Sequence, residues 1–561
     1  MARDQDYDIA IAGLGPTGAI AAALLGQTGL RILVIDKSQT IYDKPRAVGM
    51  DHEIMRVFQN IGVANKVQPL TAPFTTSEHY GADGQLIRRV GMLPPPYPMG
   101  WTPTMAFRQP QVEQILRDRL GELPSVEVRL GVEMVGMTQD ADGVNLELQA
   151  GENAKQVKRA GYLIGCDGAS STVRRLAGIA LDDLGFDEPW LVIDLLVNDS
   201  GLEKLPMVNT HFCEPARPSL FVVCTDNHRR WEMMLLPGED PREMEREDQV
   251  WKLLSRWITP QDAELWRSAS YRFHAVVAAQ WRNGRVLLAG DAAHQQPPFL
   301  GQGMCQGIRD VRNLVWKLQH IISGDGGATL LDSYEEERSA HVRSLIETIK
   351  GIGRYICEVN PALARARDTR MLEASGGIVK TLIRQELMPG LTSGFFSGQS
   401  HPARGTLMPQ PYVLKNGHPV LLDDATGSGW RVVLGENTAG WDVKVTNLLN
   451  VIRLSQLPID GALQETDGVL AAWMDHHSCA AAIVRPDHYV YAVASDAANL
   501  AKEIAILETR LVVANKNRPN SNAKQLSLRR ACKGGMAVCD SFGAKVCTIL
   551  RCSNRLLAPM A

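Results

Sequence analysis

The sequence lacks a hydrophobic run long enough to cross a membrane. A transmembrane helix needs about 20 consecutive apolar residues, and no such stretch occurs among the 561 residues. The first residues, Met1 to Asp8, are polar and acidic, unlike the basic and then apolar start of a signal peptide. These absences predict a cytoplasmic protein with no membrane partner.

An excess of charge of one sign is also missing. The net charge is −3 and charged residues make up 22% of the chain, so the composition does not indicate a nucleic-acid partner. A hydrophobic content of 45% is typical of a globular protein. The length exceeds that of one ordinary core, so we expect two or three domains, and a homodimer is compatible with the sequence.

The cysteines lack the paired spacing of metal ligands. Six of the ten are scattered singly, which predicts reduced thiols and no metal site. The other four fall in the last thirty residues, and residues 501–561 also hold eleven Lys or Arg against three Asp or Glu. We expect 501–561 to be an atypical, disordered tail; a basic interaction arm and a changed reading frame near residue 500 are the alternatives.

A glycine-rich turn stands between two predicted strands near the N-terminus. Residues 7–12 and 31–36 are short and apolar, as in a parallel sheet buried on both faces. Between them, the Ala- and Leu-rich stretch 16–29 is predicted to be a helix, and Gly13–Gly18 reads Gly-Leu-Gly-Pro-Thr-Gly. This order of strand, turn, helix and strand is that of a dinucleotide-binding βαβ unit.

Each conspicuous residue of this unit has a physical role. Gly13 permits the tight turn, Gly15 lets the backbone approach a pyrophosphate, and Gly18 lets the helix pack against the sheet. The helix N-terminus faces the phosphates. Asp36, at the end of the second strand, can accept hydrogen bonds from a ribose hydroxyl pair. The unit predicts a dinucleotide without separating FAD from NAD.

Two later motifs bear on that choice. Residues 166–174, Cys-Asp-Gly-Ala-Ser-Ser-Thr-Val-Arg, follow a predicted strand. Residues 290–294, Gly-Asp-Ala-Ala-His, follow the strand 286–289 and lead through two prolines to residues 301–304 and a helix. An Asp at a strand end can hold a ribityl hydroxyl, and backbone N–H groups at a helix start can stabilise negative charge on a reduced flavin.

The three motifs, in this order, resemble those of the class A flavoprotein aromatic monooxygenases, the family of para-hydroxybenzoate hydroxylase and phenol hydroxylase. The resemblance covers about residues 6–390. It implies FAD as cofactor, NADH or NADPH as reductant, and O₂ and a phenolic small molecule as substrates.

The resemblance also implies an α/β fold in which a Rossmann-type FAD-binding domain carries an inserted β-sheet substrate domain, followed by a C-terminal thioredoxin-like α/β domain. We expect the FAD-binding domain at 1–180, the substrate sheet at 181–280, the return of the FAD-binding domain at 281–395, and the thioredoxin-like domain at 406–497. A structural role is expected for that last domain because it has no Cys-x-x-Cys.

The cofactor residues are carried over from the family motifs. Arg46 matches an arginine near the flavin, and Gln109 matches a helix-start residue offered to the cofactor; a surface loop and a helix cap are their alternative roles. The expected cofactor-binding set is Gly13, Gly15, Pro16, Thr17, Gly18, Asp36, Lys37, Arg46, Gln109, Asp167, Gly290, Asp291, Pro298, Gly301, Gln302, Gly303 and Met304.

Several segments narrow the resemblance to one branch of the family. Residues 45–51, 107–112, 230–239 and 485–487 resemble 3-(3-hydroxyphenyl)propionate hydroxylases. The implied reaction converts a monocyclic phenolic acid, first 3-(3-hydroxyphenyl)propionate, to its 2,3-dihydroxy product. A hydroxylase of a polycyclic aromatic, polyketide or antibiotic and a non-catalytic flavin-binding redox module are the alternatives.

The sequence does not identify the catalytic base. Arg46 is expected at the catalytic centre, and His211, Asp51 and His52 are candidates for the base, each with a structural alternative. A substrate carboxylate needs a cation, which Arg217 or Arg230 could supply, unless both are surface charges. His294 is expected to order the flavin loop rather than to transfer protons.

Overall fold

The computed structural model describes residues 6–513, except 325 and 328. The predictions for residues 514–561, with their four cysteines, lie outside the described residues. The six cysteines within the described chain are free thiols.

The first sheet is the core of a Rossmann-type domain. Strand β1 (Tyr7–Ala12) pairs in parallel with β2 (Ile32–Asp36) on one side and with β11 (Gln156–Gly165) on the other. Helix α1 (Pro16–Gly26) packs against α4 (Gln109–Gly121) and α9 (Gly303–Ser323). The predicted βαβ unit is therefore present, with the first strand at the exact bounds expected. The remaining strands of this sheet are β8 (Val126–Leu130), β9 (Glu133–Gln139), β10 (Val144–Gln149), β17 (Arg282–Asn283) and β18 (Val286–Leu288).

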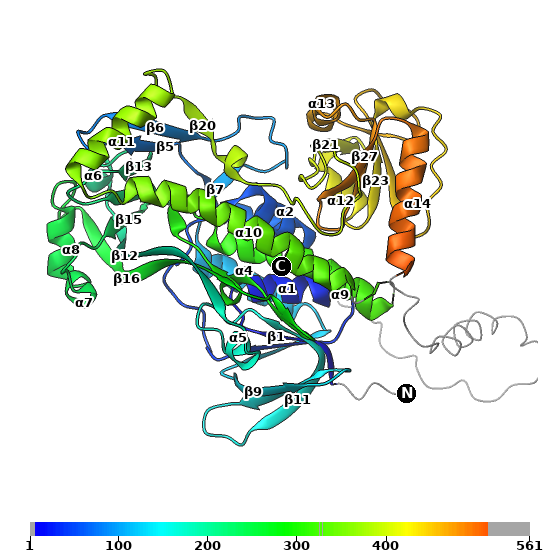
Figure 1. Ribbon diagram of the computed structural model, residues 1–561, viewed down its shortest axis with the longest axis horizontal. Coiled ribbons are helices and arrows are strands. Elements are labelled where there is room, and N and C mark those ends of the chain that lie inside the picture. The colour runs from blue at the N-terminus through cyan, green and yellow to red at the C-terminus, as the bar shows by residue number, and fades with distance from the viewer. Residues whose placement is uncertain (1–5, 325, 328, 514–561) are drawn as a thin grey trace, which may run out of the picture. The chain divides into compact units, whose positions relative to one another are not determined.

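The second sheet has nine strands and is drawn from three stretches of the chain. Its order is β19-β16-β12-β15-β14-β13-β5-β6-β20, and the long strands β12 and β16 lie side by side in Figure 1. The expected bounds 181–280 were too narrow, because pairing across the sheet also recruits strands from residues 77–91 and 381–383. The strands are β5 (Ser77–Tyr80), β6 (Leu86–Gly91), β12 (Leu181–Val197), β13 (Asn209–Phe212), β14 (Ser219–Val223), β15 (His228–Met234), β16 (Ala263–Ala278), β19 (His294–Gln295) and β20 (Thr381–Ile383).

A small third sheet and several helices complete this part of the chain. Helix α10 (Thr329–Ile356), the long green helix of Figure 1, packs along α9. No described helix is both long and apolar enough to cross a bilayer. The third sheet consists of β3 (Gly49–Asp51), β7 (Thr104–Phe107) and β4 (Thr71–Pro73), and the helices include α2 (His52–Asn60), α5 (Thr172–Leu176), α8 (Glu247–Leu254) and α11 (Pro361–Ala374).

The C-terminal module is a five-stranded sheet with three helices. Its strand order is β25-β24-β23-β26-β27. Residues 443–446 have no regular structure. The elements are β23 (Arg431–Leu434), β24 (Asn450–Ser455), β25 (Leu463–Gln464), β26 (Ala481–Val484), β27 (Val490–Ala494), α12 (Leu422–Thr426), α13 (Val469–His476) and α14 (Ala497–Val513).

Helix α14 corrects the expected start of the tail at residue 501. Leu500, Ile504, Leu507 and Leu511 are buried and recur every three or four residues, so one helical face packs into the core next to β27. The basic composition of residues 501–561 concealed this periodic segment at its beginning.

Buried ion pairs join the C-terminal module to the rest of the described chain. Arg56 on α2 makes a two-point contact with Asp423 on α12, with nitrogen–oxygen distances of 2.7 and 3.0 Å. Arg485, after β26, pairs with Glu337 on α10 at 2.7 Å. All four side chains are almost completely buried. These ion pairs therefore attach the C-terminal module to α2 and α10.

Candidate active site

One cavity of about 790 Å³ runs from the glycine-rich turn of the first sheet to the face of the second sheet. Gly15 and Asp36 line its first end, and Val192, His211 and Glu232 line the other. A ligand bound at the turn and one bound on the second sheet would thus share one cavity.

The turn is built so that backbone lines this cavity. Gly13 has φ +98°, and a Cβ there would collide with the carbonyl oxygen of Cys166. A Cβ on Gly18 would collide with the carbonyl oxygen of Gly13, whereas a Cβ on Gly15 would meet nothing within 4 Å. Gly15 is the N-cap of α1 and no side chain caps this helix. The first N–H groups of α1 are therefore left for a ligand.

Asp36 ends β2 beside this turn. Its carboxylate accepts hydrogen bonds from Leu14 N at 2.6 Å and Ser38 N at 2.7 Å. The side chain still lines the cavity, and each carboxylate oxygen has a further lone pair for a hydroxyl donor.

The loop that carries Arg46 is held from two sides. Gln109 Oε1 accepts hydrogen bonds from the backbone N–H of Arg46 at 2.9 Å and of Ala47 at 2.6 Å. Arg230 donates to the backbone carbonyls of Pro45 and Arg46, each at 2.8 Å. Arg46, Gln109 and Arg230 all line the cavity, but the amide oxygen of Gln109 and the guanidinium of Arg230 are already engaged in positioning this loop.

Two carboxylates hold the later motifs in place. Asp167 accepts hydrogen bonds from Ser171 Oγ and from the N–H groups of Thr172 and Val173 at the start of α5. Asp310 on α9 accepts from Gly290 N at 3.0 Å and contacts His294 Nε2 at 2.7 Å. His294 therefore anchors the loop backbone, as expected from the sequence.

Most of the predicted cofactor residues meet at this cavity. Gly18, Gly290 and Gln302 do not line it; the two glycines lie behind the turn, and Gln302 accepts a hydrogen bond from Arg309. The predicted residues that line it are Gly13, Gly15, Pro16, Thr17, Asp36, Lys37, Arg46, Gln109, Asp167, Asp291, Pro298, Gly301, Gly303 and Met304.

Comparison with known protein families accounts for this arrangement. Residues 6–348 match the family described as an FAD binding domain, and residues 405–508 match the HcaD C-terminal domain. The first match covers more than half of the chain and contains the glycine-rich turn and both later motifs. The chain belongs to the FAD-dependent aromatic monooxygenases.

Curated relatives agree with this assignment over nearly the whole chain. A probable NADH-specific resorcinol 4-hydroxylase from Rhodococcus jostii is 37% identical over 507 residues, which cover 88% of this chain and 93% of the relative. A 3-(3-hydroxy-phenyl)propionate/3-hydroxycinnamic acid hydroxylase from Mycolicibacterium gilvum is 34% identical, over 88% of this chain and 90% of the relative.

Solved structures share the fold of this monooxygenase. The flavin-dependent monooxygenase PieE, solved with FAD and substrate, has a TM-score of 0.74 at 21% identity, covering 91% of this chain and all of the other. Aklavinone-11 hydroxylase, solved with FAD and aklavinone, has a TM-score of 0.73 at 23% identity, covering 91% of this chain and 99% of the other. At these identities the likeness concerns the fold.

The residues present fit FAD, the cofactor of this monooxygenase. The uncapped start of α1 and the open space over Gly15 suit a pyrophosphate, and Asp36 can accept ribose hydroxyls. At the other end, Gly301 has a left-handed φ of +57° and leads into α9, where Gly303 and Met304 line the cavity. The start of this 21-residue helix favours negative charge on a bound group.

The second sheet lines the other end of the cavity. Val48, Leu220 and Val222 form a buried apolar cluster against Phe74. His211 lines the same end and stacks on His79, with ring centroids 3.9 Å apart. Burial, together with the Arg384 and Arg88 cations, lowers the pKa of His211 to about 3. His211 is therefore neutral near pH 7 and able to accept a hydrogen bond.

Two of the three candidate bases lie elsewhere. Asp51 and His52 line a separate cavity of about 180 Å³. Asp51 caps α2 through Glu53 N and Ile54 N, and its other oxygen pairs with Arg309 at 2.6 Å. Both oxygens are thus occupied, so Asp51 serves the packing of α2. His52 is buried, which lowers its pKa to about 4, and it does not line the main cavity.

The two predicted substrate cations are also engaged in structure. Arg217 pairs with Glu239 at 2.5 Å, donates to Met234 O and does not line the cavity. Arg230 reaches the cavity, but four of its five guanidinium N–H groups already bind Asp194 and the loop carbonyls. Because both arginines are already paired within the protein, neither is placed to bind a substrate carboxylate. A sequence pattern does not reveal such pairing.

Two charged residues of the cavity were missed by the sequence analysis. Glu232 lies two residues after Arg230 on β15, so strand alternation could have placed it on the same face. Arg384 follows β20 as the first residue of a short 3-10 helix (Arg384–Leu387) and also lines the cavity. No local pattern marks Arg384, because its position depends on the pairing of β20 with β6.

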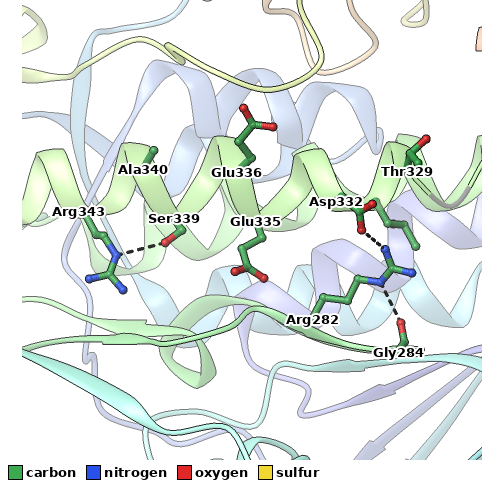
Figure 2. A pocket seen from close by; sticks show the side chains of 10 residues that line it. Arg282, Gly284, Thr329, Asp332, Glu335, Glu336, Ser339, Ala340 and Arg343 are labelled. Atoms are coloured by element: carbon green, nitrogen blue, oxygen red, sulfur yellow. Dashed lines mark hydrogen bonds and ion pairs between the residues drawn. The ribbon is translucent and has the colours of Figure 1, made fainter. Parts of the chain in front are cut away.

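A further hollow of about 820 Å³ lies along α10. Figure 2 shows Arg282 directed toward Asp332, with which it pairs at 2.6 Å, and Arg343 beside Ser339. None of the predicted site residues belongs to it. We assign it no chemistry.

Proposed function

We propose that this monooxygenase hydroxylates a monocyclic phenolic acid, with 3-(3-hydroxyphenyl)propionate and its 2,3-dihydroxy product as the first candidate, using NADH as reductant. The observation that carries the proposal is the single cavity shared by the cofactor cradle and the second sheet. A substrate on the sheet then lies next to the ring end of the cofactor, as oxygen transfer requires.

When bound, FAD takes electrons from the nicotinamide and activates O₂ for transfer of one oxygen atom to the ring. The protein must hold the phenol and keep water away from the reacting atoms. Val48, Leu220 and Val222 provide an apolar wall for the ring, and Phe273 and Phe299, which pack on Trp190, add aromatic surface. Hydrogen-bonding side chains at the ends of this wall can orient the substituents.

A second candidate is a neutral phenol such as resorcinol. The Rhodococcus jostii relative is named for it, and resorcinol resembles 3-(3-hydroxyphenyl)propionate in carrying a substituent meta to a phenolic hydroxyl. The two candidates differ in charge at that substituent, so the charged side chains of the cavity decide between them. Polycyclic phenols and a non-catalytic flavin protein are the remaining alternatives.

The test begins with the purified protein and its flavin spectrum. NADH and O₂ consumption are then followed with 3-(3-hydroxyphenyl)propionate, resorcinol and a polycyclic phenol. The masses of the products are determined by mass spectrometry. We expect stimulation by the monocyclic compounds and a product heavier by one oxygen atom. Absence of bound flavin, or NADH oxidation that no phenol stimulates, would overturn the proposal.

A further inference from the structure

Glu232 is a buried carboxyl group that faces the cavity without a hydrogen-bond partner. Its side chain is only 6% exposed, it lines the cavity, and no described residue donates a hydrogen bond to its Oε2. Burying an acceptor without a partner is costly. An unpaired carboxylate aimed into a binding cavity is therefore most simply completed by a donor on the ligand.

Strand register fixes where this carboxyl lies. Glu232 on β15 pairs directly with Leu220 on β14, and Leu220 pairs with His211 on β13. Directly opposed residues of antiparallel strands point to the same face, so the three side chains form a row. With strands about 4.8 Å apart, the row has a carboxyl at one end, an apolar floor and a histidine at the other end.

At the His211 end of this row lies an arginine without an ion-pair partner, close enough for its charge to act on His211. Arg384 is 7% exposed and lines the cavity beyond His211. One of its nitrogens donates to Leu300 O and its guanidinium lies 5.5 Å from the Phe74 ring centre. Among the described residues, no carboxylate is within ion-pair distance of it; Asp51, which is paired with Arg309, acts on it only at longer range. Buried cations are normally paired, so this side chain favours an anionic ligand group.

The position of Arg384 is well determined by its neighbours. Strand β20 pairs with β6 through Ile383 and Gly91. The adjacent Gln385 accepts a hydrogen bond from Leu93 N and donates to Thr104 Oγ1. The guanidinium is thus presented by an anchored segment, which reduces the entropy lost when it binds an anion.

We infer that the cavity holds its substrate between two charged ends, with Arg384 binding the carboxylate of a phenol carboxylate and Glu232 accepting the hydrogen bond of its phenolic hydroxyl. This inference rests on the proposed function and selects the acidic substrate over a neutral diphenol. The apolar row at Leu220 then receives the aromatic ring. Arg384 and Glu232 act as substrate-binding residues that set specificity.

The electrostatics of each end match these roles. Burial raises the pKa of Glu232 to about 7, although the Arg230 cation opposes the shift, so a substantial fraction is ionised near neutral pH and accepts a hydrogen bond. Asp194 and Arg267 are the other charged groups that act on it. Neutral His211 does not compete with Arg384 for the anion. A carboxylate placed beside Glu232 instead would meet like charge, which fixes the direction of binding.

Equilibrium binding without NADH tests the inference through ligand-induced changes in flavin absorbance. Three ligands are compared: 3-(3-hydroxyphenyl)propionate, its amide, and 3-phenylpropionate, which lacks the hydroxyl. In the wild-type protein we expect the amide and the hydroxyl-free acid each to bind at least about tenfold more weakly, since a hydrogen bond to a charged group contributes about 1.5–3 kcal/mol.

Variants assign each loss to one residue. Arg384→Gln should weaken the phenolic acid about tenfold or more and leave the amide within about twofold, so that acid and amide bind alike. Glu232→Gln should reduce the advantage of the phenolic acid over 3-phenylpropionate. Arg384→Lys, which keeps the charge, should recover part of the affinity. Arg217→Gln and Glu188→Gln, which alter charges of the same sheet outside the cavity, are the matched controls.

The outcomes separate the inference from the proposed function. If Arg384→Gln weakens acid and amide equally, or Glu232→Gln leaves the hydroxyl preference intact, the inference is wrong even though the enzyme turns over phenols. If resorcinol binds better than the phenolic acid, the charged-end assignment also fails. If no phenol stimulates NADH oxidation but the ligand preferences follow the pattern, binding is as inferred and the proposed reaction fails.

Discussion

Arg230 and Asp194 form a buried two-point ion pair beneath the loop that carries Arg46, with nitrogen–oxygen distances of 2.7 and 3.0 Å. Arg230 also donates to the carbonyls of Pro45 and Arg46. The pair thus connects the floor of the second sheet to a loop that lines the cofactor cavity.

Asp194→Asn should destabilise the protein because it leaves Arg230 buried without its counter-charge. Removing one partner of a buried pair costs about 3–5 kcal/mol, to be measured by denaturant or thermal unfolding. The matched comparison is Arg217→Gln, which breaks a partly exposed pair with Glu239 and should cost at most about 1 kcal/mol. Equal losses in the two variants would contradict the role of the buried pair.

Replacing Gly15 should remove the cofactor and spare the fold. A Cβ on Gly15 meets no protein atom within 4 Å, so Gly15→Glu places a carboxylate where the pyrophosphate binds. We expect loss of the flavin absorbance with an unchanged far-ultraviolet circular dichroism spectrum. Gly13→Ala is expected to act differently, because a Cβ at this position, where φ is +98°, would collide with the Cys166 carbonyl oxygen. This variant should therefore lower the yield of soluble protein. If Gly15→Glu retained its flavin, the assignment of the Gly13–Gly18 turn as the pyrophosphate-binding site would be wrong.

The raised pKa of Glu232 predicts that the free energy of unfolding depends on pH. Its pKa is about 7 in the folded protein and about 4.3 in an unfolded chain. Because the pKa is higher in the folded protein, the stabilising contribution of Glu232 is fully present at pH values below its unfolded pKa. This contribution is lost as the pH rises through the folded pKa of about 7. The loss amounts to roughly 4 kcal/mol. Glu232→Gln should therefore be more stable than wild type at pH 8 and not at pH 4, as thermal unfolding at both pH values would show. A difference independent of pH would contradict this.

The C-terminal module should depend on Glu337 for its attachment. Glu337 is fully buried on α10 and binds Arg485 at 2.7 Å and Lys317 at 3.0 Å. Glu337→Gln should lower the free energy of unfolding by about 3–5 kcal/mol and increase proteolysis in residues 389–405. Glu336→Gln, at the next, exposed position of the same helix, is the control and should change little.

The sequence predicted those parts of the fold whose signals are local. Strand β1 and the start of α1 follow from an apolar run, a glycine turn and a proline at the first helical position. Helix α14 was missed because a tail-like composition masked the spacing of Leu500, Ile504, Leu507 and Leu511. Residues 443–446 alternate in hydrophobicity like a strand but find no partner strand in the described module.

The candidate site divides in the same way. The cofactor motifs are contiguous in sequence, and most of their residues reach the cavity. The substrate end depends on pairing between distant strands and on which charges are already neutralised. Arg230 and Arg384 carry the same charge. Asp194 neutralises Arg230 through an ion pair, whereas no described carboxylate pairs with Arg384. Only three-dimensional proximity distinguishes them.

The location of Arg384 has a consequence for how substrate preference is inherited and redesigned. The match to the FAD binding domain ends at residue 348, whereas Arg384 lies beyond it on the stretch leading to the C-terminal module. Exchanging residues 349–405 between relatives would then replace the Arg384 end of the inferred substrate site, while Glu232 and the residues matched to the FAD binding domain stay in place. In chimeric or shuffled enzymes of this family, that connecting stretch is a compact place to recombine specificity.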